Sequence, residues 1–331
     1  MSFKENILVT GSSGFIGFHL TRRLLEEGYA VTGVDNHNDY YDVGLKEDRL
    51  ALLSSYPGFT FVKADIADRS GIETLFKKVQ FSCVFHLAAQ AGVRYSLQHP
   101  ESYVHSNLQG FFEILELSRL YRVPRFYFAS SSSVYGNSNE VPYREDAVVD
   151  EPVSFYAATK RANELMAYSY AQLYPLHIRG FRFFTVYGPY GRPDMAYFSF
   201  TRNIDEGHTI QLFNNGNLMR DFTYIDDVVD GLMGVFRKDE MTLLPGSSYE
   251  IFNIGNNQPV TLGYFVAVLE GFLEKMAQVE YVPMQAGDVY ATYADLSRIQ
   301  TFTGFQPRTG IEEGLGKFVD WYRSYYRQRT S

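Results

Sequence analysis

Apolar and polar positions follow two different periods along the first half of this chain. Short, continuous apolar runs have the length and composition of buried strands, and they occupy residues 6–10, 30–35, 59–64, 83–88 and 125–130. The segments between them repeat apolar side chains every three or four positions, as amphipathic helices do; these are residues 14–27, 72–79 and 107–120. Such alternation is typical of a parallel sheet covered by helices on both faces. The pattern therefore predicts a doubly wound α/β fold.

The alternation becomes less regular after about residue 184. Residues 186–196 are rich in Gly, Pro and Tyr, which predicts an ordered loop. Further on, the spacing predicts a helix near 198–206, a strand near 210–213, a helix from 226, and a C-terminal helix with Phe318, Trp321 and Tyr325. We therefore expect residues 1–184 to form one domain, to which later segments return. Residues 185–331 are expected to form mainly a smaller, interleaved α/β domain.

Composition narrows the class of protein. The 331 residues suffice for about two domains, and 45% hydrophobic and 21% charged residues are ordinary values for a globular protein. A formal net charge of -8 argues against nucleic acid or an anionic membrane surface as the main partner. Apolar runs stay well short of a membrane span, and Met1 is not followed by the apolar core of a signal peptide. We expect a cytoplasmic protein without a metal site, in which the single cysteine, Cys83, is a core residue.

A glycine-rich turn joins the first predicted strand to the first helix. It reads Thr10-Gly11-Ser12-Ser13-Gly14-Phe15-Ile16-Gly17. Glycines at such a turn let backbone N–H groups approach a pyrophosphate at the helix N-terminus. The G-x-x-G-x-x-G spacing is weak by itself, but its place between strand and helix strengthens it. The turn predicts a Rossmann-type dinucleotide site that includes Gly11, Gly14, Phe15, Ile16 and Gly17.

Residues at the ends of the next strands specify the dinucleotide further. Asp35 ends the second strand 18 residues after Gly17, where a carboxylate binds the ribose hydroxyls and repels a 2′-phosphate. The alternative is a solvated strand-end aspartate. We predict NAD rather than NADP, with Asp65 and Ile66 at the adenine edge. The small side chains of the Leu87-Ala88-Ala89 segment suit a dinucleotide lying close to the backbone.

The segment Tyr156-Ala157-Ala158-Thr159-Lys160 carries the candidate chemistry. With 26 tyrosines in the chain, a Y-x-x-x-K match is weak by itself. On a helix, however, Tyr156 and Lys160 share one face, so the phenol and the ammonium can share a site. The ammonium and a positive nicotinamide both favour the phenolate and lower the tyrosine pKa, as a general base requires. A serine run, Ser130 to Ser133, ends a strand earlier in the chain and is expected to reach the same pocket.

The glycine turn, the strand-end serines and the Tyr/Lys pair, in this order, resemble the extended short-chain dehydrogenase/reductase superfamily, which includes the NAD-dependent epimerases and dehydratases. The resemblance extends over nearly the whole chain. Further matching segments are His86-Leu87-Ala88-Ala89-Gln90, Ser133-Val134-Tyr135-Gly136, 182–189 and 220–227. Most specific is Gly191-Arg192-Pro193-Asp194-Met195-Ala196, which is similar to the signature of UDP-glucuronate 4-epimerases within that group.

The resemblance implies a role for each matching residue. Tyr156 is expected to be the general base, Lys160 to lower its pKa and hold the nicotinamide ribose, and Ser131 to bind the sugar O4. The additional cofactor contacts that it implies are Asn36, Gln90, Asn107 and Ser130. The remaining substrate contacts are Ser132, Ser133, Thr185 and Arg192 at the sugar carboxylate, Arg220 at the diphosphate, and Asp288 near the nucleotide ribose. Gln285 stands where many members have an arginine, which leaves one phosphate contact in doubt.

For three arginines a plainer interpretation stays open. Arg220 beside Asp221 could be a surface salt-bridge residue, and Arg192 could serve only to pin its Gly/Pro-rich loop. Arg94 could face either the sugar or Glu101.

The resemblance implies C4 epimerisation of UDP-glucuronate and UDP-galacturonate through a 4-keto sugar, with tightly bound NAD. Related decarboxylases carry a glutamate at the position of Ser133, and related 4,6-dehydratases carry an Asp-Glu pair at Ser132 and Ser133. Hydroxyls at both positions disfavour these reactions. The alternatives are a UDP-glucose/galactose 4-epimerase, a UDP-glucuronate decarboxylase, or a non-catalytic NAD-binding protein. Relatives pair through helices that correspond to 107–120 and 156–174, so a homodimer is expected.

Overall fold

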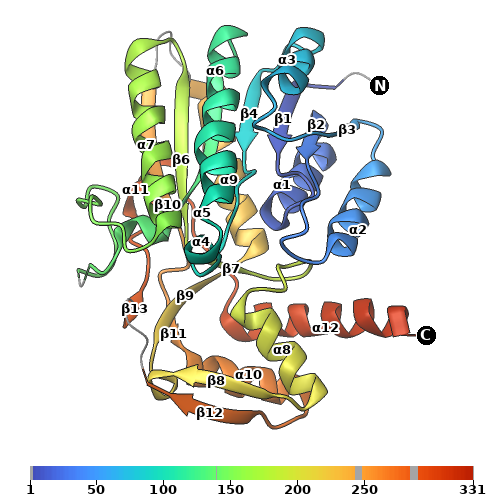
Figure 1. Ribbon diagram of the computed structural model, residues 1–331, viewed down its shortest axis with the longest axis vertical. Helices are drawn as coiled ribbons and strands as arrows, with labels where there is room; N and C mark the ends of the chain where they lie inside the picture. The colour runs from blue at the N-terminus through green and yellow to red at the C-terminus, as the bar shows by residue number, and fades with distance from the viewer. Residues whose placement is uncertain (1–2, 139, 243–247, 284–289, 331) are drawn as a thin grey trace. The chain divides into compact units, whose positions relative to one another are not determined.

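The computed structural model describes residues 3–138, 140–242, 248–283 and 290–330, with side chains described up to residue 326. The chain divides into two compact units, each built from three segments (Figure 1). The first unit comprises Met1–Gly136, Asp146–Phe183 and Val235–Phe252. The second comprises Asn137–Glu145, Phe184–Gly234 and Asn253–Ser331.

A seven-stranded sheet organises the first unit, in the order β10-β6-β5-β4-β1-β2-β3. Neighbouring strands from β3 to β6 pair in parallel. The strands are β1 (Asn6–Thr10), β2 (Ala30–Asp35), β3 (Phe59–Lys63), β4 (Cys83–His86), β5 (Arg125–Ser131), β6 (His177–Phe183) and β10 (Ser248–Ile254). Helical crossovers join the parallel strands, because such strands cannot be linked by tight turns. The Rossmann-type, doubly wound α/β fold is confirmed.

The helices of the first unit cover both faces of this sheet (Figure 1). They are α1 (Phe15–Glu26), α2 (Val43–Ser54), α3 (Arg69–Lys78), α4 (Tyr95–Gln98), α5 (Pro100–Tyr103), the π-helix η1 (Val104–Gly110), α6 (Phe111–Leu120), the 3₁₀ helix η2 (Ser132–Tyr135) and α7 (Phe155–Leu173). A further helix, α9 (Ile225–Thr242), begins in the second unit and ends in the first. Side chains that bind free backbone N–H groups define several helix starts: Asp42 at α2, Asp68 at α3 and Ser154 at α7.

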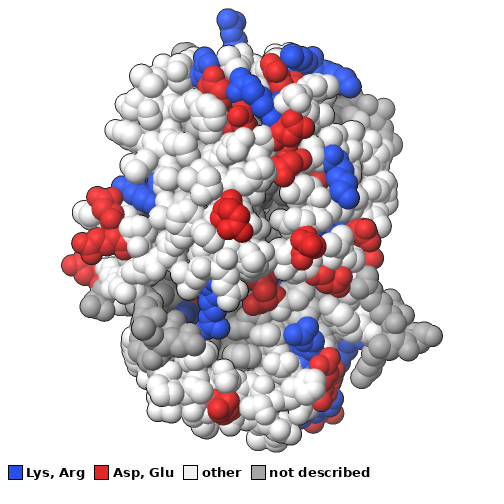
Figure 2. Space-filling view, in the orientation of Figure 1, with Lys and Arg blue, Asp and Glu red and all other residues white. Residues whose placement is uncertain are grey.

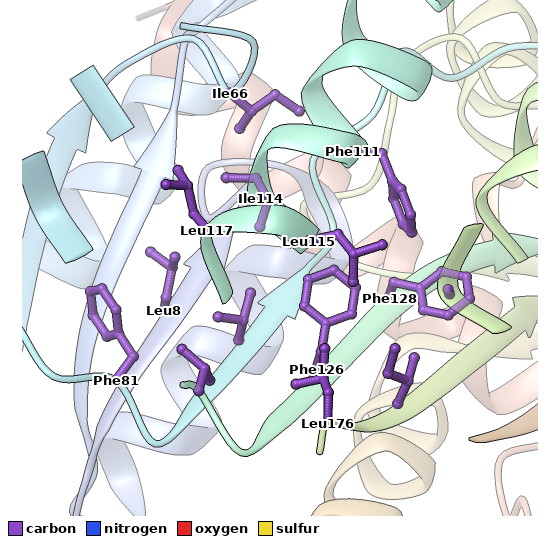
Figure 3. Close-up of a cluster of buried hydrophobic side chains, with 14 of the residues drawn as sticks. Leu8, Ile66, Phe81, Phe111, Ile114, Leu115, Leu117, Phe126, Phe128 and Leu176 are labelled. Carbon is purple, nitrogen blue, oxygen red and sulfur yellow. The ribbon is translucent and has the colours of Figure 1, made fainter. Parts of the chain in front are cut away.

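A hydrophobic cluster fills the space between the sheet and the helices α3, α6 and α7 (Figure 3). Leu8 and Phe126 of the sheet meet Phe111 and Ile114 there, and all four side chains are buried. On the opposite face, Phe236 of α9 packs against Phe85 and Tyr127. Because both faces are covered, the central strand β4 is buried at every residue.

A buried ion pair ties α9 to the sheet. Both carboxylate oxygens of Asp239 accept hydrogen bonds from Arg179 of β6, at 3.0 and 2.7 Å, and the Tyr127 hydroxyl donates a third at 2.8 Å. Burial and the adjacent carboxylate raise the pKa of Tyr127, so its phenol remains a donor. The late segment 235–252 is thereby fixed as part of the first unit.

Two smaller sheets organise the second unit. In one, β9 (Met219–Tyr224) pairs with β7 (Thr185–Tyr187), β11 (Pro259–Thr261) and β13 (Ala291–Thr292), and in the other β12 (Gln278–Val282) pairs with β8 (Thr209–Phe213). The helices are α8 (Ala196–Glu206), η3 (Asn214–Gly216), α10 (Leu262–Leu273), α11 (Ser297–Thr303) and α12 (Ile311–Thr330). Residues 186–196 are not entirely loop as predicted, because 186 and 187 pair with β9 and 196 begins α8.

Charged side chains are mixed on the face shown in Figure 2. Among the described residues visible there, Lys and Arg alternate with Asp and Glu and form no continuous basic strip. Within the described part of the chain, no helix is long and apolar enough to cross a membrane. No group of three or more His, Cys, Asp or Glu residues suited to a metal ion occurs in that part either.

Candidate active site

The glycine turn after β1 is packed as closely as the dinucleotide prediction requires. Gly11 has φ +73°, and an added Cβ would lie 2.8 Å from the Ala88 nitrogen. A Cβ on Gly17 would lie 2.0 Å from the Gly11 carbonyl oxygen. Gly14 is the N-cap of α1 and offers no capping side chain, so the first N–H groups of the helix, including those of Phe15 and Ile16, are left for another acceptor. These features fit a bound pyrophosphate.

Asp35 is held at the end of β2 by two backbone donors. Its carboxylate accepts hydrogen bonds from the N–H of Ser13, at 3.2 Å, and of His37, at 2.9 Å. The His37 ring bonds the Ser13 hydroxyl at 2.9 Å. The carboxylate is thus fixed beside the glycine turn, where the predicted ribose contact requires it.

Asn36 and Asp65 line a pocket of about 410 Å³ at the carboxyl ends of the strands. The Asn36 amide donates to Asp65 at 3.4 Å, and the His105 ring contacts the same carboxylate at 3.1 Å. Burial would raise the pKa of Asp65, but hydrogen bonds from the Ala67 N–H, His105 and Asn36 outweigh it and lower the pKa. Ile66, the neighbouring predicted contact, packs its side chain into the hydrophobic core. The donor and acceptor groups around this pocket suit a purine edge.

Asn107 joins the segment after β4 to the helix that carries the tyrosine. It lies in the π-helix η1, a distortion often found at functional sites. Its side chain accepts from the Gln90 N–H at 2.8 Å, and donates to the Gln90 carbonyl at 3.0 Å and to the Thr159 hydroxyl at 3.1 Å. In turn, the Thr159 hydroxyl donates to the Tyr156 carbonyl at 2.8 Å. The 87–90 segment and the first turn of α7 are therefore held together.

Tyr156 and Lys160 lie on the same face of α7. The Lys160 ammonium is 6.0 Å from the centre of the Tyr156 ring. The chain enters this helix through Ser154, whose hydroxyl accepts from the Ala157 N–H at 3.1 Å. Tyr103 packs edge-on against the Tyr156 ring, with centroids 6.0 Å apart. The Ser154 cap and the contact with the Tyr103 ring together fix the position of the Tyr156 phenol.

Lys160 is almost fully buried, and its ammonium donates to the Ala129 carbonyl of β5 at 2.8 Å. Burial lowers the pKa of Lys160 to about 7, although the charge of Glu164 opposes this shift. Burial, together with the charge of Lys160, lowers the pKa of His86 to about 3. His86 is therefore neutral, and it bonds the Thr10 hydroxyl at 2.9 Å. At neutral pH the His86 ring carries no charge, whereas Lys160 is near the midpoint of its titration.

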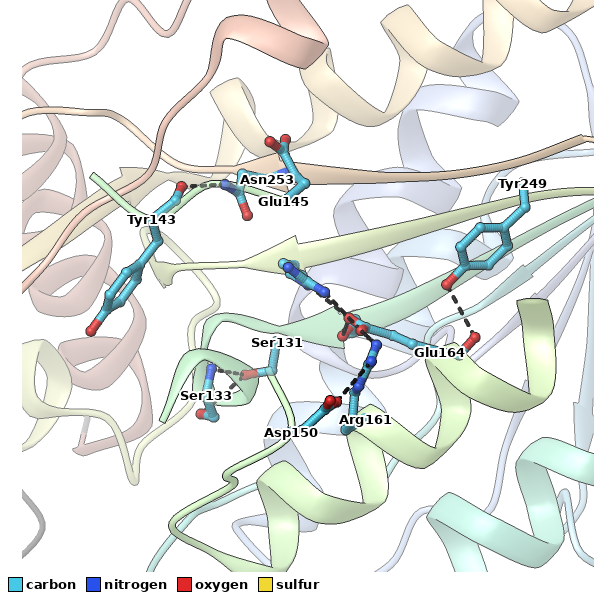
Figure 4. Close-up of polar contacts among 11 residues, drawn as sticks. Ser131, Ser133, Tyr143, Glu145, Asp150, Arg161, Glu164, Tyr249 and Asn253 are labelled. Carbon is cyan, nitrogen blue, oxygen red and sulfur yellow. Dashed lines mark hydrogen bonds and ion pairs between the residues drawn. The ribbon is translucent and has the colours of Figure 1, made fainter. Parts of the chain in front are cut away.

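Ser130 takes part in a buried charge network around Glu164, whose contact with Arg161 is seen in Figure 4. Its hydroxyl donates to Glu164 at 2.6 Å, and Arg182 binds both oxygens of the same carboxylate at 2.8 and 2.9 Å. Arg161 links Glu164 to Asp150 at the surface. Ser130 was predicted as a cofactor contact, and this prediction stays untested. The Ser130 hydroxyl proton is already used in the hydrogen bond to Glu164.

The other serines form a polar turn at the end of β5. The Ser131 hydroxyl accepts from the Ser133 N–H at 3.2 Å and contacts the Ser133 hydroxyl at 3.1 Å (Figure 4). Ser132 begins η2 between them. Three hydroxyls, rather than a carboxylic acid, are thus presented beyond the end of the strand.

The predicted substrate residues of the second unit lie on its sheet and in one loop. Thr185 begins β7 and is partly buried, while Arg220 lies on β9 and donates to the Met219 carbonyl at 2.8 Å. The adjacent Asp221 is buried and accepts from the N–H groups of Asn256, Asn257 and Ala294. Burial raises the pKa of Asp221, whereas these hydrogen bonds oppose the shift. Asp221 therefore orders the strand that carries Arg220 and is not its surface partner.

Arg192 is paired within its own loop. Its guanidinium Nε donates to Asp194 at 3.0 Å, and Nη2 binds the second oxygen of the same carboxylate. The loop backbone is held by the buried Tyr197, whose hydroxyl accepts from the Arg192 N–H at 3.1 Å. The planar fork is therefore engaged by Asp194, as the loop-pinning interpretation expects, and a substrate carboxylate would have to take the place of Asp194. Gln285 and Asp288 lie outside the described residues.

Sequence reasoning missed several residues of this region. Glu164 follows Lys160 by one helical turn, so the i, i+4 spacing was an available signal. Arg182 and Thr159 had no such signal, because their partners are distant in the sequence. Arg94, whose role was open, is exposed at the start of α4.

Residues 7–255 match the model of the NAD dependent epimerase/dehydratase family, and the chain belongs to this family. UDP-glucuronate 4-epimerase 1 of Arabidopsis thaliana is 47% identical over 98% of this chain and 78% of its own length. A crystal structure of UDP-glucuronic acid 4-epimerase from Bacillus cereus, in complex with UDP-glucuronic acid and NAD, has a TM-score of 0.89 and 31% identity, and covers 97% of this chain and 100% of that one. A UDP-glucose 4-epimerase of Thermotoga maritima with UDP-glucose has a TM-score of 0.86 and 30% identity, covering 97% and 99%.

Proposed function

We propose that this protein interconverts UDP-glucuronate and UDP-galacturonate by epimerisation at C4, with tightly bound NAD. The observation that carries this proposal is the combination of the Tyr156/Lys160 pair with a hydroxyl-only turn at Ser131–Ser133. The relatives named for UDP-glucuronate support the choice of substrate. The first unit is proposed to bind NAD, and the second mainly the nucleotide sugar.

Proton transfer at the sugar O4 is the task of Tyr156. NAD, when bound, supplies the acceptor and later the donor of the C4 hydride. The Lys160 ammonium, on the same helix face, favours the phenolate that takes the 4-hydroxyl proton. Ser131 holds the O4 atom. After the 4-keto sugar has rotated to present its opposite face, Tyr156 returns a proton to O4. The reaction therefore consumes no net acid or base.

Retention of the carboxylate distinguishes this reaction from decarboxylation. A 4-keto uronic acid is a β-keto acid, which loses CO₂ when its carboxylate bond aligns with the carbonyl π system. We propose that Ser132, Ser133, Thr185 and Arg192 hold the carboxylate out of that alignment. Planar bidentate binding by an arginine fixes carboxylate orientation as a lysine cannot. The diphosphate is assigned to Arg220.

The decisive experiment is incubation of the purified protein with UDP-glucuronate and no added NAD. UDP-galacturonate without release of CO₂ is the expected product, and Tyr156→Phe is the matched control. Formation of UDP-xylose would overturn the proposal in favour of a decarboxylase. Activity on UDP-glucose alone would favour the hexose epimerase and refute the assignment of Arg192.

The α6 and α7 helices are proposed to form a homodimer interface. They are neighbours, joined by the Tyr170 hydroxyl, which donates to Glu116 at 3.0 Å. Large apolar side chains nevertheless remain exposed on both helices: Phe112, Leu120, Leu165, Tyr168 and Leu173. Such exposure is typical of a contact surface. The double variant Leu165→Glu/Leu173→Glu should elute as a monomer in size-exclusion chromatography with light scattering, while Val148→Glu, at an exposed apolar position outside both helices, should not change the mass.

A further inference from the structure

An aromatic contact joins the two loops that flank the glycine turn. Tyr40 lies in the segment after β2, and Tyr95 begins α4 in the segment after β4. Their ring centroids are 4.7 Å apart, with the ring planes at 56°. The sheet order places β1 between β2 and β4, so this contact bridges the two strands on either side of the one that ends in the glycine turn. Both rings line the pocket that contains Asn36 and Asp65.

The loop that carries Tyr40 is anchored on both sides of the ring. The Lys46 ammonium donates to the backbone carbonyl and to the side-chain oxygen of Asn38, each at 2.7 Å. On the other side, the buried Arg49 donates to the Tyr41 hydroxyl at 2.7 Å and to the Ser13 carbonyl, within the glycine turn, at 2.8 Å. Tyr40 is therefore held in place by contacts that reach the turn itself.

The loop that carries Tyr95 is shaped to receive Tyr40. Gly92 has φ +102°, and a Cβ on it would lie 2.3 Å from the Tyr40 hydroxyl oxygen. Tyr103 donates to the carbonyls of Ala91 and Gly92 and packs between Tyr95 and Tyr156. The four tyrosine rings form a continuous series from the pocket assigned to the purine to the Tyr156 phenol.

We propose that Tyr40 and Tyr95 form a clasp that retains the dinucleotide on the enzyme through turnover. The inference rests on the proposed use of NAD, which this epimerisation regenerates in each cycle and which the enzyme gains nothing by releasing. The clasp joins two loops across the end of β1, so a dinucleotide on the glycine turn leaves faster when the rings are separated. An aromatic pair contributes about 0.5–1.5 kcal/mol beyond its buried area, and its loss appears mainly in the dissociation rate.

The test measures NAD release directly rather than turnover. Purified protein with its bound NAD is mixed with an alcohol dehydrogenase and ethanol, which reduce each NAD⁺ released into solution and report it at 340 nm. Tyr40→Ala and Tyr95→Ala should release NAD about 2- to 12-fold faster than the unmodified chain, the fold-change that corresponds to loss of one aromatic pair. Tyr40→Phe, which keeps the ring, should release it at the unmodified rate, as should Tyr281→Ala, an exposed tyrosine of the second unit.

Coupling between the two rings provides the second criterion. Because both single variants break the same contact, the double variant Tyr40→Ala/Tyr95→Ala should release NAD little faster than either one. Independent, multiplicative effects would overturn the clasp, as would an unchanged release rate in Tyr40→Ala. Far-UV circular dichroism identifies a variant that has not folded, and Gly92→Ala then separates the same two loops without removing a ring. NAD release does not depend on the sugar, so a wrong assignment of UDP-glucuronate would leave this result unaffected.

Discussion

The Lys160 ammonium donates a 2.8 Å hydrogen bond to the carbonyl oxygen of Ala129, and this bond ties the helix of the candidate base to the strand that ends in Ser131. The charge is almost completely buried, which is costly for stability and useful for chemistry. Lys160 therefore provides a test in which function and stability respond in opposite directions.

Replacement of this lysine should abolish activity and change the pH dependence of stability. For Lys160→Met we expect a loss of kcat of at least 10²-fold, because the phenolate loses its cation. Burial lowers the folded-state pKa to about 7, below the value of 10.5 for an exposed lysine. Between these values the unfolded chain binds a proton that the folded chain does not, so this group's contribution to the free energy of unfolding rises with pH.

Urea unfolding of NAD-free protein at pH 7 and pH 9 measures this contribution. The unmodified chain should gain stability relative to Lys160→Met as the pH rises. An equal change in both proteins would contradict a depressed pKa for Lys160.

Removal of the Tyr156 hydroxyl should stop the reaction without removing the cofactor. We expect Tyr156→Phe to lower kcat by about 10²–10⁴-fold, the range for loss of a general base. Its NAD content, measured by chromatography after denaturation, should equal that of the unmodified chain, because the ring still packs against Tyr103. Full turnover in this variant would refute the role of the phenol.

Neutralising Asp35 should weaken both the glycine turn and cofactor binding. In Asp35→Asn the Ser13 and His37 N–H groups no longer meet a charged acceptor, a change of about 1–3 kcal/mol in the free energy of unfolding. We also expect a higher Kd for NAD, measured by calorimetry, and a smaller preference for NAD over NADP, because the carboxylate that repels a 2′-phosphate is gone. Asp320→Asn, at an exposed aspartate of α12, is the matched control. An unchanged preference would contradict the assignment of Asp35.

The Glu164–Arg182 pair should behave as a coupled unit. Both side chains are buried, so Glu164→Gln leaves the Arg182 charge uncompensated and should cost about 3–5 kcal/mol. The double variant Glu164→Gln/Arg182→Met should be more stable than the sum of the two single changes predicts. Thermal unfolding of all four proteins measures the coupling, and additive effects would show that the two charges act independently.

Local pattern was sufficient for much of the fold. The apolar runs predicted β1 and β2 to the residue, because a strand buried on both faces must be apolar throughout. The helix α2 was missed, since its buried side chains include Lys46 and Arg49, whose charges hide the apolar face. The strand β10 was missed because its partner β6 is far away in the sequence.

The candidate site likewise contains residues that the local sequence pattern predicts and contacts that it does not predict. The sequence alone determined the glycine turn, Asp35 and the Tyr156/Lys160 pair, because each depends on spacing within one element or on the end of one strand. Only the tertiary structure decided that Asn107 joins Gln90 to Thr159, that Glu164 binds Arg182, and that Tyr40 meets Tyr95. These contacts connect segments that are distant in the chain. Local periodicity does not show which strands will be neighbours in the sheet, and so it cannot predict which residues meet at their ends.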